Sequence, residues 1–272
     1  MNACSRTVAA VVIAGTCAAP LVSAQWLNYP TPGVPKTASG APNLEAPAPR
    51  TSDGKPDLSG MWEPDKNRPC PPTGCFDAVL AEHFMDIGWG RPGGLPFQPW
   101  AAALVKERTK AFAVDDPGSN CQPVGIIKNH TLPFIKKIIQ LPGLMVILNE
   151  REVTYRQIFT DGRPQPVDPQ PSYNGYSTGR WEGDTLVVTS KGFRDGMWLD
   201  RAGSPLTPGA TITERFRRTN FGHLDIDVTV DDPKAYTAPW TVTLKQFLVI
   251  NTELIDYHCS ENERDAKHFL GK

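Results

Sequence analysis

The feature that most constrains the fold is a series of short β-type segments in the second half of the chain. From Gly143 onward, apolar and polar residues alternate in short runs that turn residues separate. Alternation with a period of two is the pattern of a strand with one buried face. We therefore expect eight strands, at residues 144–150, 153–160, 174–182, 185–193, 210–219, 223–231, 241–249 and 253–259.

The clearest pair of segments is the hairpin between Tyr173 and Phe193. Its arms meet at Gly183-Asp184, and a glycine that is first in a two-residue loop suits a primed hairpin turn. On the second arm Leu186 and Val188 alternate with more polar positions, as in a half-buried strand. This hairpin supplies the third and fourth of the expected strands.

Short antiparallel strands with no helix between them favour an all-β fold. We expect an eight-stranded, antiparallel, up-and-down barrel of the lipocalin or calycin type, or a closely related sandwich. Closure removes exposed sheet edges, and eight strands leave an interior that can hold one small ligand. One helix is expected before the strands, at about 99–113, because Pro99 suits a first helical position and residues 115–118 (DDPG) end it.

The start of the chain has the pattern of a secretory signal peptide. Arg6 precedes an apolar stretch, and Val22-Ser23-Ala24 resembles a cleavage site, so residues 1–24 are expected to be removed. A lipoprotein modified at Cys17 is the weaker alternative. Residues 25–55 are rich in proline and small residues and predict an extended or flexible arm, followed by one barrel domain at 56–272 with long proline-rich loops. We expect a periplasmic or secreted protein without a membrane span.

Charge and cysteine content narrow the class further. The formal net charge is −1 with the two signs interspersed, so no electrostatic footprint for nucleic acid is present. Four cysteines follow the expected signal peptide, and an even number in an oxidising compartment favours two disulfides. Three pairings are open, of which Cys70–Cys75 with Cys121–Cys259 is preferred because CPPTGC is a small loop.

The strand at 210–219 carries the main candidate for chemistry. Its inward face would hold Ile212, Glu214, Phe216 and Arg218, so that Glu214 lies among apolar neighbours. A carboxylate in such a place is paired, or its pKa rises. Glu214 is therefore the candidate acid or base, and the alternative is a structural ion pair with Arg218 or another arginine.

Further candidates are side chains that could line a ligand cavity. Tyr155 is a second catalytic candidate; the ligand-binding candidates are Gln246, Tyr257, Arg218 and Trp198. Buried tyrosines and glutamines more often complete a core, and Trp198 could equally close one end of the barrel. No metal site is expected, because no two histidines stand at ligand spacing and Cys70 and Cys75 have no second Cys/His pair.

Two short patterns match known motifs by letter only. GYSTG at 175–179 has the form of a nucleophile elbow at Ser177, but that motif needs a strand-turn-helix context and here leads into a hairpin. GWGRPG at 88–93 has the spacing of a dinucleotide-binding loop, but no clear strand precedes it and Pro92 interrupts it. Neither pattern is expected to carry chemistry.

Several phrases together resemble an uncharacterised family of secreted bacterial β-rich proteins. They are GKPDLSG at 54–60, DDPGSNCQPVG at 115–125, YRQIFTDGRP at 155–164, GRWEGDTLVV at 179–188, TERFRR at 213–218 and VDDPKAYTAPW at 230–240. The resemblance spans about residues 53–265 and implies a secreted, largely antiparallel β fold, without implying a reaction. Histidines are often found in that family where this chain has Leu206 and Thr211, which argues against a metal-dependent activity here.

Three functions follow as hypotheses. The first is a protein that binds a small apolar or aromatic molecule inside the barrel. The second is a cofactor-independent lyase, isomerase or hydrolase acting on an aromatic small molecule, with Glu214 as acid or base. The third is a structural envelope protein whose proline-rich arm contacts a partner. No cofactor is expected under any of them.

Overall fold

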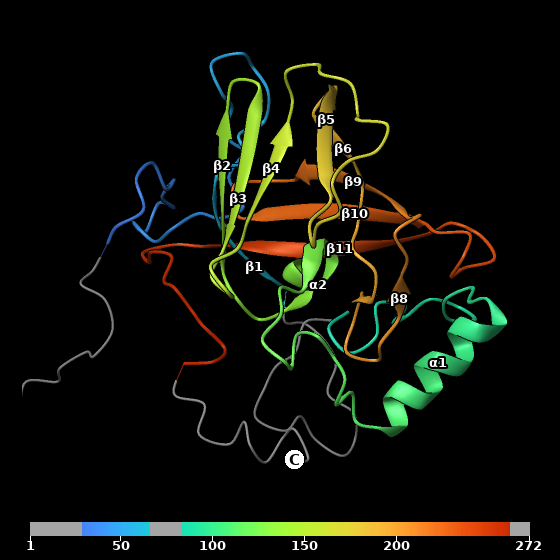
Figure 1. The fold of residues 1–272 in the computed structure, drawn as a ribbon. Coiled ribbons are helices and arrows are strands. Elements are labelled where there is room, and N and C mark those ends of the chain that lie inside the picture. The colour runs from blue at the N-terminus through green and yellow to red at the C-terminus, as the bar shows by residue number, and fades with distance from the viewer. Residues whose placement is uncertain (1–28, 66–82, 262–272) are drawn as a thin grey trace, which may run out of the picture.

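The computed structural model describes residues 29–65 and 83–261, and β-strands dominate it (Figure 1). Nine strands close into a barrel in the order β1-β11-β10-β9-β6-β5-β4-β3-β2. Their bounds are β1 (Gly60–Pro64), β2 (Lys136–Leu141), β3 (Leu144–Asn149), β4 (Tyr155–Phe159), β5 (Tyr176–Glu182), β6 (Thr185–Lys191), β9 (Thr211–Arg218), β10 (His223–Asp231) and β11 (Trp240–Val249). The short strands β7 (Met197–Trp198) and β8 (Pro205–Leu206) form a separate two-stranded sheet. The expected all-β barrel is confirmed.

The expected number of eight strands is wrong. Seven of the expected strands are present, and β1 and β2 complete the ring. The strand expected at 253–259 is absent, since this segment makes only an isolated bridge between Arg151 and Tyr257. β2 was not predicted from the alternation of apolar and polar residues, because the charged residue Lys136 occupies one of its buried positions.

The odd number of strands has a topological consequence. Directions can alternate around a closed ring only when the number of strands is even, so a ring of nine must contain a parallel neighbouring pair. That pair is β4 and β5, which share only two residue pairs, Ile158 with Ser177 and Phe159 with Thr178. A parallel pair needs a long connection, here residues 160–175. The up-and-down arrangement therefore fails at this one seam, although the strand order follows the chain.

Alternation sets the inner face of the barrel as expected. On β10 the buried residues are Leu224, Ile226, Val228 and Val230, and the aspartates between them face outward. Val242, Leu244, Gln246 and Leu248 are buried on β11. The inward apolar side chains belong to one continuous hydrophobic cluster.

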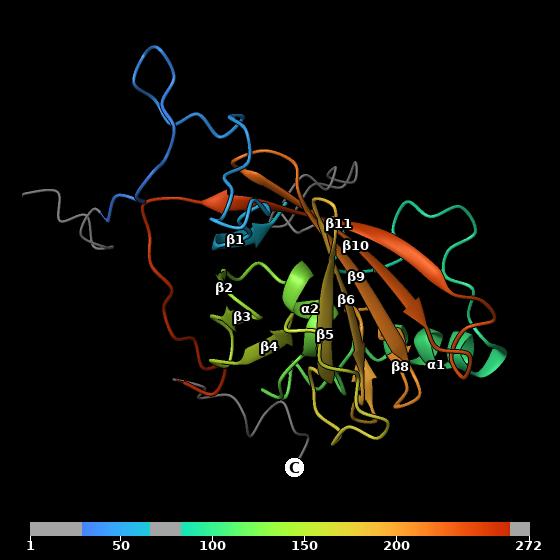
Figure 2. The ribbon, with the colours of Figure 1, turned by 90° about the horizontal axis from the view of Figure 1, so that it is seen from above.

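Among the described residues, two helices accompany the barrel. Helix α1 (Pro99–Lys110) ends three residues before the expected position 113, because Phe112 and Ala113 have positive φ angles of 53° and 54°. Helix α2 (Gly125–Thr131) was not expected; almost all of its residues are buried. Figure 2 shows α2 inside the outline of the strands, so that it covers one end of the barrel.

One of the expected disulfides is present. Cys121 and Cys259 are bonded, with 5.4 Å between their Cα atoms. Cys70 and Cys75 lie outside the described residues, as does the expected signal peptide. Within 29–65 and 83–261, no helix has the length and apolar character that crossing a membrane requires.

Candidate functional site

The centre of the site is a buried ion pair between Glu214 on β9 and Arg156 on β4. Glu214 is 0% exposed, as expected for the inward face of its strand. Arg156 donates from Nη1 to Oε1 over 3.0 Å and from Nη2 to Oε2, so both carboxylate oxygens are bound. The partner of Glu214 is thus Arg156 and not Arg218. A two-point contact of this kind fixes the geometry of both groups.

Two serines extend the pair toward the β4–β5 seam. Arg156 Nε donates to Ser177 Oγ over 3.1 Å, and Nη2 donates to Ser190 Oγ over 2.9 Å. The two hydroxyl oxygens are 2.8 Å apart. Arg156 therefore makes four hydrogen bonds in this network and has one further N–H, on Nη1. One serine donates to the other, which leaves one hydroxyl hydrogen for a further acceptor.

His130, on α2, binds the other side of Glu214. Its Nε2 lies 2.9 Å from Glu214 Oε1, and because a carboxylate only accepts hydrogen bonds, Nε2 carries the hydrogen. Burial lowers the pKa of His130 to about 4, although the hydrogen bond with Glu214 opposes this shift. The ring is therefore neutral at pH 7, and Nδ1 presents a lone pair. Nδ1 is buried and has no hydrogen-bond partner among the described residues.

Glu214 remains ionised in this environment. Burial on its own would raise the pKa of Glu214, but the charge of Arg156 and the hydrogen bonds from His130 and Arg156 lower it to about 2. At neutral pH Glu214 is thus a charged acceptor that holds the imidazole of His130 in one tautomer. A group with this pKa has no proton to give at pH 7.

A second polar contact reaches the same histidine from the opposite wall. Lys136 Nζ donates to Gln246 Oε1 over 2.5 Å, and Gln246 Nε2 donates to the backbone oxygen of His130 over 3.0 Å. Burial lowers the pKa of Lys136 to about 7, against the opposing charge of Glu63. Burial therefore disfavours the charged form of this interior lysine.

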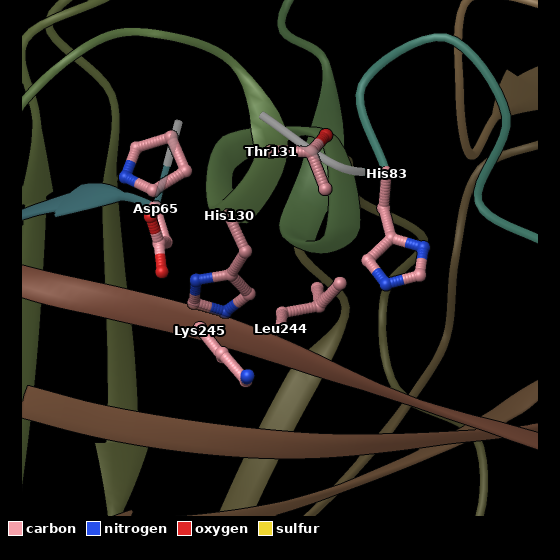
Figure 3. Close-up of a pocket in the computed structure, with 7 residues that line it drawn as sticks. Asp65, His83, His130, Thr131, Leu244 and Lys245 are labelled. Carbon is pink, nitrogen blue, oxygen red and sulfur yellow. The ribbon is translucent and has the colours of Figure 1, made fainter. Parts of the chain in front are cut away.

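A small hollow adjoins His130. It measures about 20 Å³, and its lining is Pro64, Asp65, His83, His130, Thr131, Leu244 and Lys245. Figure 3 shows His130 projecting from α2 toward β11, with His83 on a separate loop. This His130 hollow has about the volume that one water molecule needs.

A much larger depression lies at the parallel seam. It measures about 470 Å³ and is lined by Pro123, Val153, Thr154, Tyr155, Arg156, Gln157, Phe159 and residues 172–177. We call it the seam groove. Its lining includes Tyr155 and Gln157 from the outer face of β4, together with Arg156 and Ser177, whose side chains are buried on the inner face.

The backbone at both ends of the groove has special conformations. Gly175 has a φ of 58°, and a Cβ there would lie 2.6 Å from the Lys191 carbonyl oxygen, so only glycine fits where β5 begins. Val153 has a φ of 48°, which is unusual for a β-branched residue, and it is 52% exposed. Val153 and Tyr155 also line a second depression of about 590 Å³ against residues 254–256.

The structure separates most of the candidates that the sequence suggested. Gln246 and Glu214 both contact His130, whereas Tyr155 is 64% exposed on the outer surface. Tyr257 packs on Phe134 with ring centroids 4.9 Å apart. The other two are held elsewhere: Arg218 donates to backbone carbonyls, including that of Phe221, and Trp198 lies under Arg108.

Sequence reasoning missed His130, Arg156, Ser177 and Ser190 as members of this network. Arg156 could have been found, because it shares the inward face of its expected strand with Ile158. Ser177 and Ser190 sit at inward positions too, where small polar residues need a partner. His130 lies on a helix that no pattern indicated. It lies 84 residues from Glu214 in the chain, so no local feature links the two.

The described residues contain one cluster with metal-ligand types, Cys121, Glu152 and Cys259. Its two sulfur atoms are joined in the disulfide, so neither is a free thiolate that could bind a metal.

Comparison with protein-family models gives no match, and no curated protein is significantly similar to the chain. A function for this chain therefore has to be argued from its own residues and geometry.

Proposed function

We propose that the chain is a periplasmic or secreted, lipocalin-like protein that binds a small aromatic molecule in the seam groove. The observation that carries the proposal is the groove itself, which has a volume of about 470 Å³, aromatic walls and a polar floor. Ligand sites are typically concave, of about 300–1,000 Å³, mostly apolar and equipped with a few polar groups. The Cys121–Cys259 disulfide supports an oxidising compartment.

The walls of the groove suit a flat apolar ligand. Tyr155, Phe159, Tyr173 and Tyr176 all line it, and Phe159 stacks on Tyr176 with ring centroids 5.3 Å apart. Aromatic pairs in offset or edge-to-face contact contribute about 0.5–1.5 kcal/mol beyond the area that they bury. An aromatic ligand between these rings would gain such contacts.

The floor of the groove suits a ligand with a hydrogen-bond acceptor. Arg156 and Ser177 line it, but their side chains are 5% and 1% exposed, so a ligand would reach the spare N–H and hydroxyl hydrogen of their network only through the seam. Their positions are fixed by Glu214 and Ser190, so little ordering is lost on binding. A phenol or a carboxylate at the end of an aromatic ring has the required chemistry.

The strained turn beside the groove also supports this assignment. Val153 holds a left-handed conformation while half of its surface is exposed, so its own packing gives little compensation for the strain. Backbone outliers of this kind cluster at binding sites. We place the ligand in the groove and not at the barrel centre, because the inward apolar side chains form a continuous cluster there.

The test is calorimetric titration of the purified protein with 4-hydroxybenzoate and indole. We expect saturable binding of at least one of them, and about tenfold weaker binding after Tyr155→Ala, equivalent to about 1.4 kcal/mol. Tyr29→Ala removes another exposed tyrosine, one that is absent from the groove lining, and should leave the affinity unchanged. Native mass spectrometry of protein from its own host would identify a co-purifying ligand.

Two results would overturn the proposal. One is equal binding by the wild type and the Tyr155→Ala variant, which would move the site out of the groove. The other is the absence of saturable binding for both probes together with no co-purifying small molecule.

A cofactor-independent lyase, isomerase or hydrolase is the second candidate, and one observation favours it. His130 has the form of a general base, since Glu214 orients one ring nitrogen and leaves the other with a lone pair. In this reading Glu214 is a positioning residue and His130 accepts the proton. Turnover of an aromatic substrate should then be lost in His130→Gln. Unchanged turnover in that variant would exclude His130 as the base.

A further inference from the structure

A second pocket, which shares no lining residue with the seam groove, lies where the C-terminal segment meets the loop after α1. It measures about 210 Å³, against about 20 Å³ for the His130 hollow. Its lining is Phe84, Asp116, Gly118, Ser119, Lys128, Leu132, Arg151, Arg201, Tyr257 and Cys259. Cys259 is fixed there by its disulfide to Cys121.

The charges in this lining are unbalanced. Lys128, Arg151 and Arg201 carry three positive charges, whereas Asp116 is the one carboxylate of the lining. Lys128 Nζ lies 2.8 Å and 2.7 Å from the two oxygens of Asp116, and Arg201 Nη1 lies 3.2 Å from Oδ2. Lys128 and Arg201 therefore share the carboxylate of Asp116, whereas Arg151 does not contact it.

Arg151 is the cation with the least compensation. Its side chain is 11% exposed, and its nearest carboxylate among the ion pairs of the described residues is Glu152, at 4.0 Å. One guanidinium nitrogen, Nη2, donates to the Gly118 carbonyl. Its Nε is buried and has no hydrogen-bond partner among the described residues. A buried charged donor without an acceptor is costly, so Arg151 is the least compensated cation of this lining.

The electrostatics at Lys128 point the same way. Burial lowers the pKa of Lys128, while the charges of Asp116 and Asp200 oppose the shift and the charge of Arg151 adds to it. Asp200 itself is occupied by backbone N–H groups, including those of Gly203 and Ser204. The charge of Arg151 thus disfavours the charged form of Lys128.

We propose that this pocket binds a small oxyanion, a carboxylate or phosphate group, between Arg151 and Arg201. Guanidinium groups match both kinds of oxyanion with paired hydrogen bonds, and an anion here would add negative charge to a lining that has three cations and one carboxylate. Phe84, Leu132 and Tyr257 provide an apolar wall for the rest of a small organic acid. The site is independent of the seam groove, because the two linings share no residue.

The experiment is calorimetric titration of the disulfide-bonded protein with inorganic phosphate and with acetate, at constant ionic strength in chloride. We expect saturable binding of at least one anion; tighter phosphate binding would identify a phosphate site and tighter acetate binding a carboxylate site. Arg201→Gln should weaken binding at least tenfold. The side chain of Arg201 is 35% exposed, so this variant keeps the fold better than one at Arg151 would.

The matched control is Arg215→Gln, which removes an arginine that is 44% exposed and paired with Glu182 on the barrel wall. It should bind the anion as the wild type does. Absence of saturable binding of both anions, or equal weakening in the Arg215→Gln and Arg201→Gln variants, would overturn the proposal.

Discussion

Replacing Glu214 with glutamine tests the central ion pair directly. The substitution keeps the shape of the side chain and removes its charge, as protonation would. The shift of the pKa of Glu214 from 4.5 to about 2 corresponds to about 3 kcal/mol, at about 1.4 kcal/mol per pH unit. Removing one partner of a buried pair typically costs about 3–5 kcal/mol. We therefore expect Glu214→Gln to lower the free energy of unfolding by about 3 kcal/mol at pH 7.

The pH dependence of this loss gives a second check. Because the folded pKa lies below the unfolded value, the stabilisation by Glu214 is complete above pH 4.5 and is lost as the pH falls toward 2. Glutamine does not titrate. The difference between wild type and variant in urea denaturation should thus shrink from about 3 kcal/mol at pH 7 to about 1 kcal/mol at pH 3.

Two further variants make the test specific. Arg156→Met combined with Glu214→Gln should cost about 2–3 kcal/mol less than the sum of the two single losses, because no unpaired charge remains. Glu182→Gln, in an exposed ion pair with Arg215, should have no measurable effect. A loss for Glu214→Gln that is independent of pH, or additive with Arg156→Met, would refute the assigned pairing.

Three other predictions concern stability and can be measured by urea denaturation. Lys136→Met should stabilise the protein at pH 6, because burial of the charged lysine costs up to about 5 kcal/mol below its folded pKa of about 7. The gain in the free energy of unfolding should fall as the pH rises toward 10.5, the pKa of an unperturbed lysine. A gain that is constant with pH would contradict this. Cys259→Ser opens a loop spanning 138 residues and should cost up to about 5 kcal/mol under oxidising conditions, so an unchanged stability would argue against the Cys121–Cys259 bond. Gly183→Ala places a side chain at a φ of 61° and should cost about 1 kcal/mol, so an unchanged stability would argue against the primed turn.

The sequence predicts well what local alternation determines. The inward face of β9 was expected residue by residue, because this strand pairs with a neighbour close in the chain and buries one face. β2 was missed because a lysine occupies one of its inward positions, and β1 because it is short and ends in Pro64. Closure of the ring depends on β1 pairing with both β2 and β11, which no local pattern indicates.

The candidate site was predicted in part for the same reason. Alternation placed Glu214 inward and required a partner for it, but which arginine approaches depends on how the barrel closes. Arg156 is 58 residues away from Glu214, whereas Arg218, the named alternative, lies on the same strand, where it contacts backbone carbonyls at the barrel end. His130 lies on the seven-residue helix α2. This helix is held in place by its burial, and no pattern of apolar and polar residues in the sequence indicates it.

The odd number of strands also determines where the barrel is weakest. β4 and β5 are joined by two residue pairs, whereas β5 and β6 share seven and β9 and β10 share eight. Local opening of the ring should therefore begin at this seam, and its amides should exchange with solvent earliest. A molecule that contacts both Tyr155 and Tyr176 would span the seam and act as a removable cross-link. Occupancy of the groove would then be coupled to the integrity of the whole barrel.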